Sequence, residues 1–137
     1  MIFPRAGIQL KKYREAIDDY ERTLELNPRF ARAYDNYAWL LATAEDPEFR
    51  DPTQAVFYAQ KACELTGHEN WSHISTLAAS YAEAGDFHSA RKWLVKSHQL
   101  APEDQKIKLV KLVKLYESEL HKSTEVKANP EKKRIRL

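Results

Sequence analysis

The sequence repeats itself at intervals of 39 and then 35 residues, and this periodicity limits the chain to a small set of folds. Three alanines separated by these intervals occupy matched positions: Ala16, Ala55 and Ala90. The same two intervals separate the residues that we expect to end helices: Pro28, Gly67 and Pro102. A period of about 34 residues accommodates one pair of helices, and such pairs stack into elongated arrays. The spacing therefore predicts a helical repeat protein.

The segments that precede two of these alanines match each other as well. Large residues recur at the helical spacing i, i+3 and i+7, at Tyr34, Tyr37 and Leu41 and again at Ile74, Leu77 and Tyr81. A small residue follows the middle member of each trio, Ala38 in the first and Ala78 in the second. Two antiparallel helices approach closely only where one side chain is small, because protein interiors are tightly packed. The small residues therefore predict where paired helices cross.

The most complete repeat begins with Leu-Ala-Ala-Ser-Tyr-Ala-Glu-Ala-Gly-Asp-Phe at residues 77–87 and continues through Ala90 to Pro102. It resembles the motif of the tetratricopeptide-repeat (TPR) family, with Ala78 in place of the usual glycine. The resemblance extends over residues 5–102. It implies an all-α fold, a short right-handed solenoid of antiparallel helix pairs with a C-terminal capping helix. The TPR family implies a non-catalytic interaction module, an adaptor or scaffold that binds other proteins.

Local chemistry and the repeat together predict the domain boundaries. We expect a TPR domain over residues 1–121 and a disordered basic tail over 122–137, because the tail is polar and lacks periodicity. Within the domain we expect a partial repeat at 5–28, repeats at 31–67 and 70–102, and a capping helix at 103–121. The first repeat is partial because only residues 5–11 remain for its leading helix. The middle repeat has a longer inter-helix loop near residues 44–51, which resembles a bacterial-type variant of the family.

Two helix starts are predicted from capping residues. Asp51 precedes Pro52 and can cap the next helix, with Gln54 placed for a capping box. Asp86 can cap the helix that starts at Phe87. Gly85, which comes just before, suits the left-handed residue that ends a helix.

The family resemblance implies a concave groove lined by the first helix of each pair. The side chains expected to face this groove and bind a peptide are Arg32, Asp35, Asn36, Trp39, Thr43, Ser72, Ser75, Thr76, Ala79 and Glu83. Trp39 would supply the apolar contact for an extended peptide. The alternative, in which Trp39 packs into the core against a neighbouring helix, remains equally open, because tryptophan is usually mostly buried.

Some TPR proteins hold the acidic carboxy-terminal tails of chaperones with a clamp of Lys, Asn and Arg residues. Asn36 matches one clamp asparagine, whereas Arg5 takes the place of the other. Ser72 and Thr76 replace the Lys and Arg, so the charge that fixes a carboxylate is missing. We therefore predict that the chain does not bind chaperone tails.

The sequence indicates no catalytic site, no metal site and no cofactor. It has no phosphate-binding loop, no glycine-flanked serine nucleophile and no pair of histidines at the i, i+4 spacing of a helical zinc site. Its one cysteine, Cys63, lies in an alanine-rich helical pattern and is interpreted as a small core residue. The chain is therefore not expected to be an enzyme.

The C-terminal part of the sequence is basic. Lys108, Lys111 and Lys114 form a stripe on the capping helix, and residues 122–137 carry six Lys or Arg against two Glu. Contact with nucleic acid or an anionic membrane is the alternative function that this pattern allows. A solvated face and tail is the preferred interpretation, so nucleic acid or membrane partners are not expected.

The N-terminal residues allow self-association. Met1, Ile2, Phe3, Ile8 and Leu10 are apolar, and a shortened first repeat would leave the next helix partly uncovered. The chain shows neither the apolar core of a secretory signal nor an apolar run of about 20 residues that could span a bilayer. We therefore expect a cytoplasmic protein whose partner is another protein or peptide.

Overall fold

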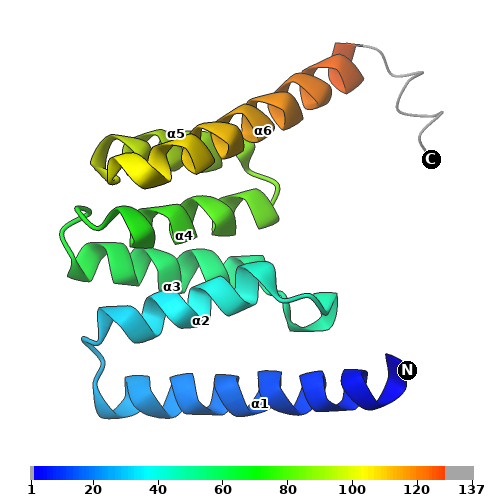
Figure 1. Cartoon of the computed structure of the whole chain (residues 1–137), viewed down its shortest axis with the longest axis vertical. Helices are drawn as coiled ribbons and strands as arrows, with labels where there is room; N and C mark the ends of the chain where they lie inside the picture. The colour runs from blue at the N-terminus through cyan, green and yellow to red at the C-terminus, as the bar shows by residue number, and fades with distance from the viewer. Residues whose placement is uncertain (1, 129–137) are drawn as a thin grey trace.

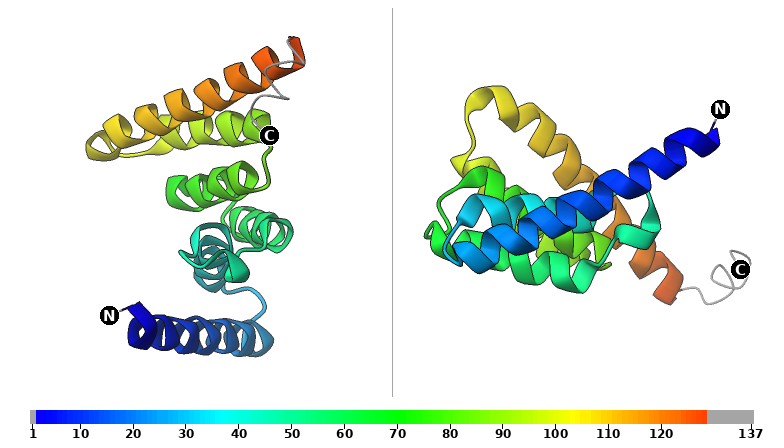
Figure 2. Two further views of the ribbon diagram at one scale, coloured as in Figure 1. Left: turned by 90° about the vertical axis from the view of Figure 1, so that its right-hand side faces the viewer. Right: turned by 90° about the horizontal axis from the view of Figure 1, so that it is seen from below.

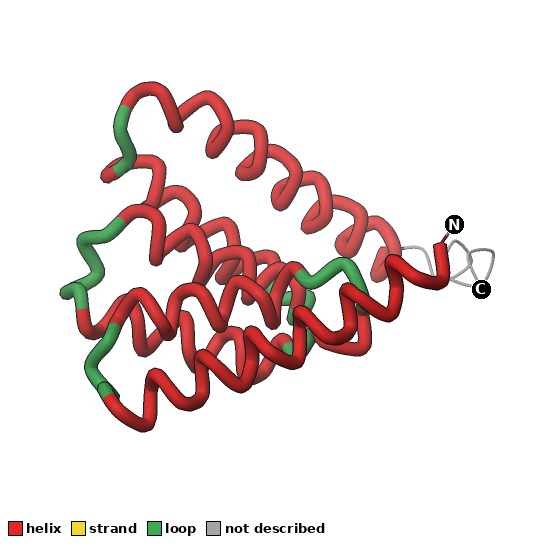
Figure 3. The backbone as a smooth tube through the Cα atoms, turned by 60° about the horizontal axis from the view of Figure 1, so that its bottom comes forward, coloured by secondary structure: helices red, strands yellow, loops and turns green. Residues whose placement is uncertain are grey.

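The computed structural model describes the backbone of residues 2–128 and the side chains of residues 10–125. Every regular element in that range is helical (Figure 3). The elements are α1 (Ile2–Leu26), α2 (Ala31–Thr43), the short 3-10 helix η1 (Pro47–Phe49), α3 (Pro52–Leu65), α4 (Trp71–Glu83), α5 (Phe87–Leu100) and α6 (Glu103–Ala128). The predicted all-α class is confirmed.

The helices are stacked so that each one packs mainly on its neighbours in the sequence (Figure 1). Helices α2 and α3 form one antiparallel pair, and α4 and α5 form the next. Helix α1 packs on α2 at one end of the stack, and α6 packs on α5 at the other. The two described chain ends therefore lie at opposite ends of an elongated molecule, as the left-hand view of Figure 2 shows. This arrangement is a short helical solenoid.

Small residues lie where the helices cross, as the repeat predicted. Ala55 and Ala90 on the second helix of each pair are fully buried, and so are Ala38 and Ala78 on the first. Ala16, the matched residue of α1, is only half-buried. It lacks a partner helix, so its exposure follows directly from the incomplete first repeat.

The core is divided into three apolar clusters, one for each junction along the stack. The first joins α1 to the first pair through Ile17, Tyr20 and Leu24, which pack against Tyr37 and its neighbours. The second lies between the two pairs, and the third lies between the second pair and α6. Each layer thus depends on the next one for its burial, as in other solenoids.

Helix α1 differs from the expected partial repeat, because no turn separates residues 5–11 from the rest. The repeat alignment explains why. Gly85 ends α4 with a φ of +82°, and the Asp86 side chain accepts a hydrogen bond from the Ser89 amide at the start of α5. Lys11 and Lys12 stand at these two positions in the first repeat. Neither suits a left-handed turn or an N-cap, so the helix continues without a break.

The N-terminal half of α1 runs beyond the other helices in the right-hand view of Figure 2. The side chains of residues 2–9 lie outside the described part of the chain. Self-association through the apolar N-terminus therefore stays a prediction.

The long loop of the middle repeat is well ordered. Asp46 caps η1, and Asp51 caps α3 by accepting a hydrogen bond from the Gln54 amide at 3.1 Å. The guanidinium of Arg50 donates to the Ala44 carbonyl at 2.6 Å, which closes the loop. The predicted cap at Asp51 is confirmed, with Pro52 at the first helical position.

Helix α6 extends further than the sequence predicted. The capping helix was expected to end at His121, and residues 122–137 were expected to be disordered, but residues 122–128 are helical. Pairs at helical spacing support this last section: His121 Nε2 lies 3.3 Å from Glu125 Oε1, and Lys122 Nζ lies 3.2 Å from Glu119 Oε1. Residues 129–137, the remainder of the predicted tail, lie outside the described residues.

Candidate functional site: a groove between α2, α4 and α6

A groove of about 640 Å³ opens on one side of the stack, bounded mainly by α2, α4 and α6. Nine of the ten side chains expected to face a groove line it, all except Arg32. Arg32 is exposed, but it is not part of the groove wall. The family resemblance implied which residues share this surface. Whether they bind a peptide is a separate question.

The groove exists because α6 diverges from α4. The leading helices α2 and α4 pack against each other, whereas α4 and α6 have no comparable contact. Figure 1 shows α6 tilting away from the stack towards its C-terminal end. The face that α6 turns inward carries Leu109, Leu112, Val113 and Tyr116. These side chains are too large for the close crossing that Ala38 and Ala78 permit elsewhere in the stack.

The sequence predicted only part of the groove wall. Residues of α6 and α5 complete it: Leu94, Gln105, Lys108, Leu109, Leu112 and Tyr116. Leu109, Leu112 and Tyr116 follow the helical spacing i, i+3 and i+7, which predicts a shared apolar face but does not distinguish a core face from a groove wall. That distinction depends on the angle between α4 and α6.

Trp39 lies at the rim of the groove, with 51% of its surface exposed. The alternative in which Trp39 fills the core is therefore wrong. The adjacent residues Tyr37 and Ala38 are the ones that α2 buries in the core at this point, so Trp39 lies on a different side of the helix. An exposed indole beside the small side chain of Thr43 leaves an apolar surface open to the groove.

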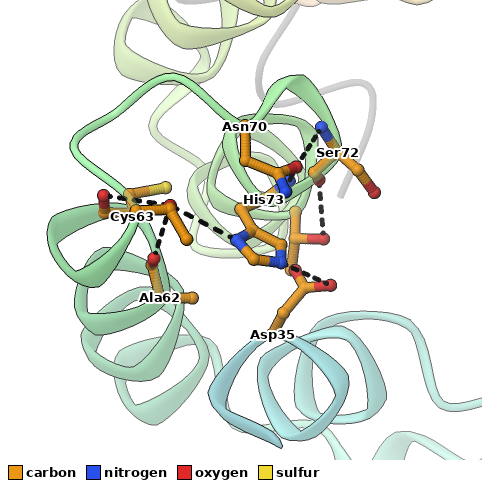
Figure 4. Close-up of polar contacts among 8 residues, drawn as sticks. Asp35, Ala62, Cys63, Asn70, Ser72 and His73 are labelled. Atoms are coloured by element: carbon orange, nitrogen blue, oxygen red, sulfur yellow. Dashed lines mark hydrogen bonds and ion pairs between the residues drawn. The ribbon is translucent and has the colours of Figure 1, made fainter. Parts of the chain in front are cut away.

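The wall between α2 and α4 contains a mostly buried carboxylate (Figure 4). Asp35 Oδ2 lies 3.9 Å from His73 Nε2, and the Asp35 Oδ1 atom is buried without a hydrogen-bond partner among the described residues. Burial raises the pKa of Asp35 above its ordinary value, and the Thr76 hydroxyl and His73 oppose this shift. Asp35 and His73 thus join the two leading helices through a polar contact inside the groove wall.

His73 also reaches towards α3. Its Nδ1 atom lies 3.4 Å from the hydroxyl of Thr66, at the end of that helix. The N-cap residue Asn70 fixes the start of α4 by accepting hydrogen bonds from the amides of Ser72 and His73. Figure 4 shows this ring held between α2 and α3. The groove wall is therefore braced by three helices.

A salt bridge holds one charged residue of the groove wall. Arg50 Nη1 lies 3.6 Å from Glu83 Oε1, so the loop after α2 is tied to the end of α4. Lys108 of α6 also lines the groove. The groove therefore combines an apolar floor with charged groups of both signs at its edges.

Cys63 is fully buried in the cluster between the two helix pairs, which confirms its interpretation as a small core residue. Burial raises the pKa of its thiol to about 12. A thiol with this pKa carries almost no thiolate at neutral pH and is a poor nucleophile. Cys63 therefore has a structural role, as a packed residue of the core.

Two other classes of site were searched in the described residues. No group of three His, Cys, Asp or Glu side chains is arranged to hold a metal ion there. None of the helices within residues 2–128 combines the length and hydropathy that a bilayer-spanning segment requires.

Comparison with known proteins supports a tetratricopeptide-repeat assignment. A family model described as tetratricopeptide repeat matches residues 5–30. No curated protein matches the sequence. The matched segment covers most of α1 and the turn that follows it, and the two helix pairs beyond it repeat the position of its small residue Ala16 at Ala55 and Ala90. The match over residues 5–30 and the all-helical stack together support a tetratricopeptide-repeat family assignment.

Proposed function

We propose that this chain is an adaptor whose groove between α2, α4 and α6 binds a peptide or a helix of another protein. TPR repeats generally mediate protein–protein interactions, and the family is typically non-catalytic. A cytoplasmic location remains a prediction from the sequence.

The observation that carries the proposal is the open apolar groove with Trp39 at its rim. A volume of about 640 Å³ accommodates several side chains of a ligand, within the size range of protein binding clefts. The floor is formed by Ala79, Leu109 and Leu112, and the hydroxyls of Ser72 and Ser75 lie along one wall. Apolar anchors surrounded by a few polar groups are the usual arrangement for peptide recognition.

Affinity capture with matched variants tests this proposal. The wild-type chain, Trp39→Ala, Asn36→Ala and a control variant would each be used to capture proteins from the native cell, with quantitative mass spectrometry as the readout. Phe57→Ala is the control, because Phe57 is an exposed aromatic residue of α3 outside the groove. A groove ligand should be retained by Phe57→Ala and lost by the two groove variants.

The captured segment would then be synthesised and titrated, with tryptophan fluorescence as the signal. Trp39 is the exposed aromatic side chain of the groove, and loss of an aromatic residue that anchors a ligand typically costs about 2 kcal/mol, so Trp39→Ala should weaken binding roughly 30-fold. The affinity should change little with salt. Partners that survive both groove variants but are lost with Phe57→Ala would show that the binding surface lies elsewhere.

A further inference from the structure

Helix α6 exposes aliphatic side chains on the face that it turns away from the stack. Ile107 is 71% exposed, Leu115 is 52% exposed and Val110 is 37% exposed. The inner face of this helix is occupied by other apolar residues, Leu109, Leu112, Val113 and Tyr116. A terminal helix of a solenoid usually presents a polar outer face, because nothing covers it. These three residues depart from that rule.

Lysines lie among the exposed aliphatic residues. Ile107, Val110, Lys111 and Lys114 follow the spacing i, i+3, i+4 and i+7, so they form a single stripe along the helix. Leu115 lies beside this stripe, one turn after Lys111. We call these five residues the apolar–basic face of α6.

The positive charge of this face is largely uncompensated. The segment from Gln105 to Tyr116 contains four lysines and no acidic residue. Lys108, Lys111 and Lys114 are exposed, and none of them forms an ion pair among the described side chains. Acidic residues flank this segment at both ends: Glu103 is paired with Lys106 at 3.5 Å and Glu117 with Arg91 of α5 at 3.7 Å. Asp104 lies four residues before Lys108, and the two form no ion pair among the described residues. The face therefore attracts anionic groups.

Two other ways to cover the aliphatic residues are a second copy of the chain and another part of the same chain. If two copies paired α6 against α6 around a two-fold axis through Lys111, the lysines of the two copies would face each other. Like charges placed opposite each other destabilise such a contact. Among the described residues no other element covers this face, since α6 is the outermost layer of the stack (Figure 1).

Contrary to the expectation from the sequence, we propose that the apolar–basic face of α6 docks on the surface of an anionic lipid membrane, with the helix lying parallel to the membrane plane. Ile107, Val110 and Leu115 would enter the boundary between headgroups and acyl chains, as in interfacial helices. The lysines would extend their aliphatic stems along this layer and place their ammonium groups among the anionic headgroups. The groove lies on the opposite side of α6 and would remain open, so this function is independent of the proposed peptide binding.

Vesicle co-sedimentation of the full-length chain tests the proposal. The probes are phosphatidylcholine vesicles with and without phosphatidylserine, at low and at physiological salt. We expect binding only to the vesicles with phosphatidylserine, and weaker binding as salt is raised. Each surface lysine contributes roughly fivefold to such binding. Lys111→Glu combined with Lys114→Glu should therefore reduce it by more than tenfold.

Two further variants separate the parts of the mechanism. Ile107→Ser combined with Leu115→Ser removes the aliphatic contact and should also reduce binding severalfold. Lys11→Glu combined with Lys12→Glu is the matched control, because it makes the same change in net charge on exposed residues of α1. This control should lose much less binding. All altered side chains are exposed, and circular dichroism would verify that each variant is folded.

Several outcomes would overturn the proposal. It fails if phosphatidylserine vesicles are not bound at low salt, or if the α1 control loses as much binding as the lysine variant of α6. It fails if the aliphatic variant binds like the wild type. It also fails if replacing Lys132, Lys133, Arg134 and Arg136 by Gln abolishes binding while the α6 variants retain it. Binding to duplex DNA or RNA but not to vesicles would assign the face to nucleic acid. A dimer that dissociates in the aliphatic variant, with no vesicle binding, would assign it to a second copy.

Discussion

At the scale of single residues, small side chains decide which helices pair. Ala38, Ala78, Ala55 and Ala90 are all fully buried at helix crossings, so none of these sites has room for a larger side chain. Ala16 shows the reverse case, since it is half-exposed where the partner helix is missing. Alanine therefore occupies the matched position in the complete and the incomplete repeats, but it is fully buried only where a partner helix is present.

Replacing Ala78 with Leu tests the tightest of these crossings. Ala78 has no exposed surface and contacts the cluster that joins α4, α5 and α6. Three added heavy atoms should overpack the site and lower the free energy of unfolding by about 1–3 kcal/mol. Urea denaturation of the wild type and the variant measures this change. Ala84→Leu, at an exposed position beyond the end of α4, is the control and should change stability by less than about 0.5 kcal/mol.

The Cys63 thiol should be inert in the folded protein. Its pKa of about 12 leaves almost no thiolate at pH 8, and no part of its surface is exposed. Ellman's reagent should therefore react slowly with the native chain and rapidly after denaturation in guanidinium. Fast stoichiometric reaction under native conditions would show that α3 opens readily or is packed differently.

At the scale of elements, capping residues determine where each helix begins and ends. Asp51, Asn70 and Asp86 each accept hydrogen bonds from amides in the first turn of α3, α4 and α5. The first repeat has Lys12 at the position of Asp86, and α1 there continues without a turn. One missing cap and one missing glycine thus change a predicted helix pair into a single long helix.

Asp86→Ala should destabilise the start of α5. The carboxylate accepts hydrogen bonds from the Ser89 amide at 3.1 Å and the Ser89 hydroxyl at 2.7 Å, and these bonds lower the pKa of Asp86. Loss of such a cap costs roughly 1 kcal/mol at neutral pH. Because the folded pKa is below the unfolded value, this contribution is present above the unfolded pKa and disappears as the pH falls through the folded pKa.

Thermal unfolding between pH 7 and pH 2.5 measures this effect. The difference in melting temperature between the wild type and Asp86→Ala should be largest at neutral pH and should shrink on acidification. A difference that stays constant over this range would mean that the Asp86 charge does not act through the cap.

At the scale of the whole molecule, stability should decrease from the middle of the stack towards its ends. Helices α3 and α4 have packed layers on both sides, whereas α1 contacts little besides α2. In a solenoid each layer is stabilised by its neighbours, so end layers open most easily. The groove lies towards the end of the stack formed by α6. This helix packs on α5 but has no comparable contact with α4.

Native-state hydrogen exchange resolves this gradient. Amides of α3 and α4 should exchange most slowly, and amides in the N-terminal half of α1 and the C-terminal half of α6 should exchange fastest. Uniform protection across all helices would show that the chain unfolds as a single cooperative unit, with no weaker end layers.

The sequence by itself determined the features that depend on local chemistry and spacing. The repeat period, the buried alanines and the caps at Asp51 and Asp86 follow from helical periodicity and from residue type, and the resemblance that the repeat carries implied nine residues of the groove. Only the tertiary structure decided the angle between α4 and α6 and the exposure of Trp39 and of the outer face of α6. Helical spacing specifies which residues share a face. Whether that face becomes core, groove or open surface depends on how distant layers pack.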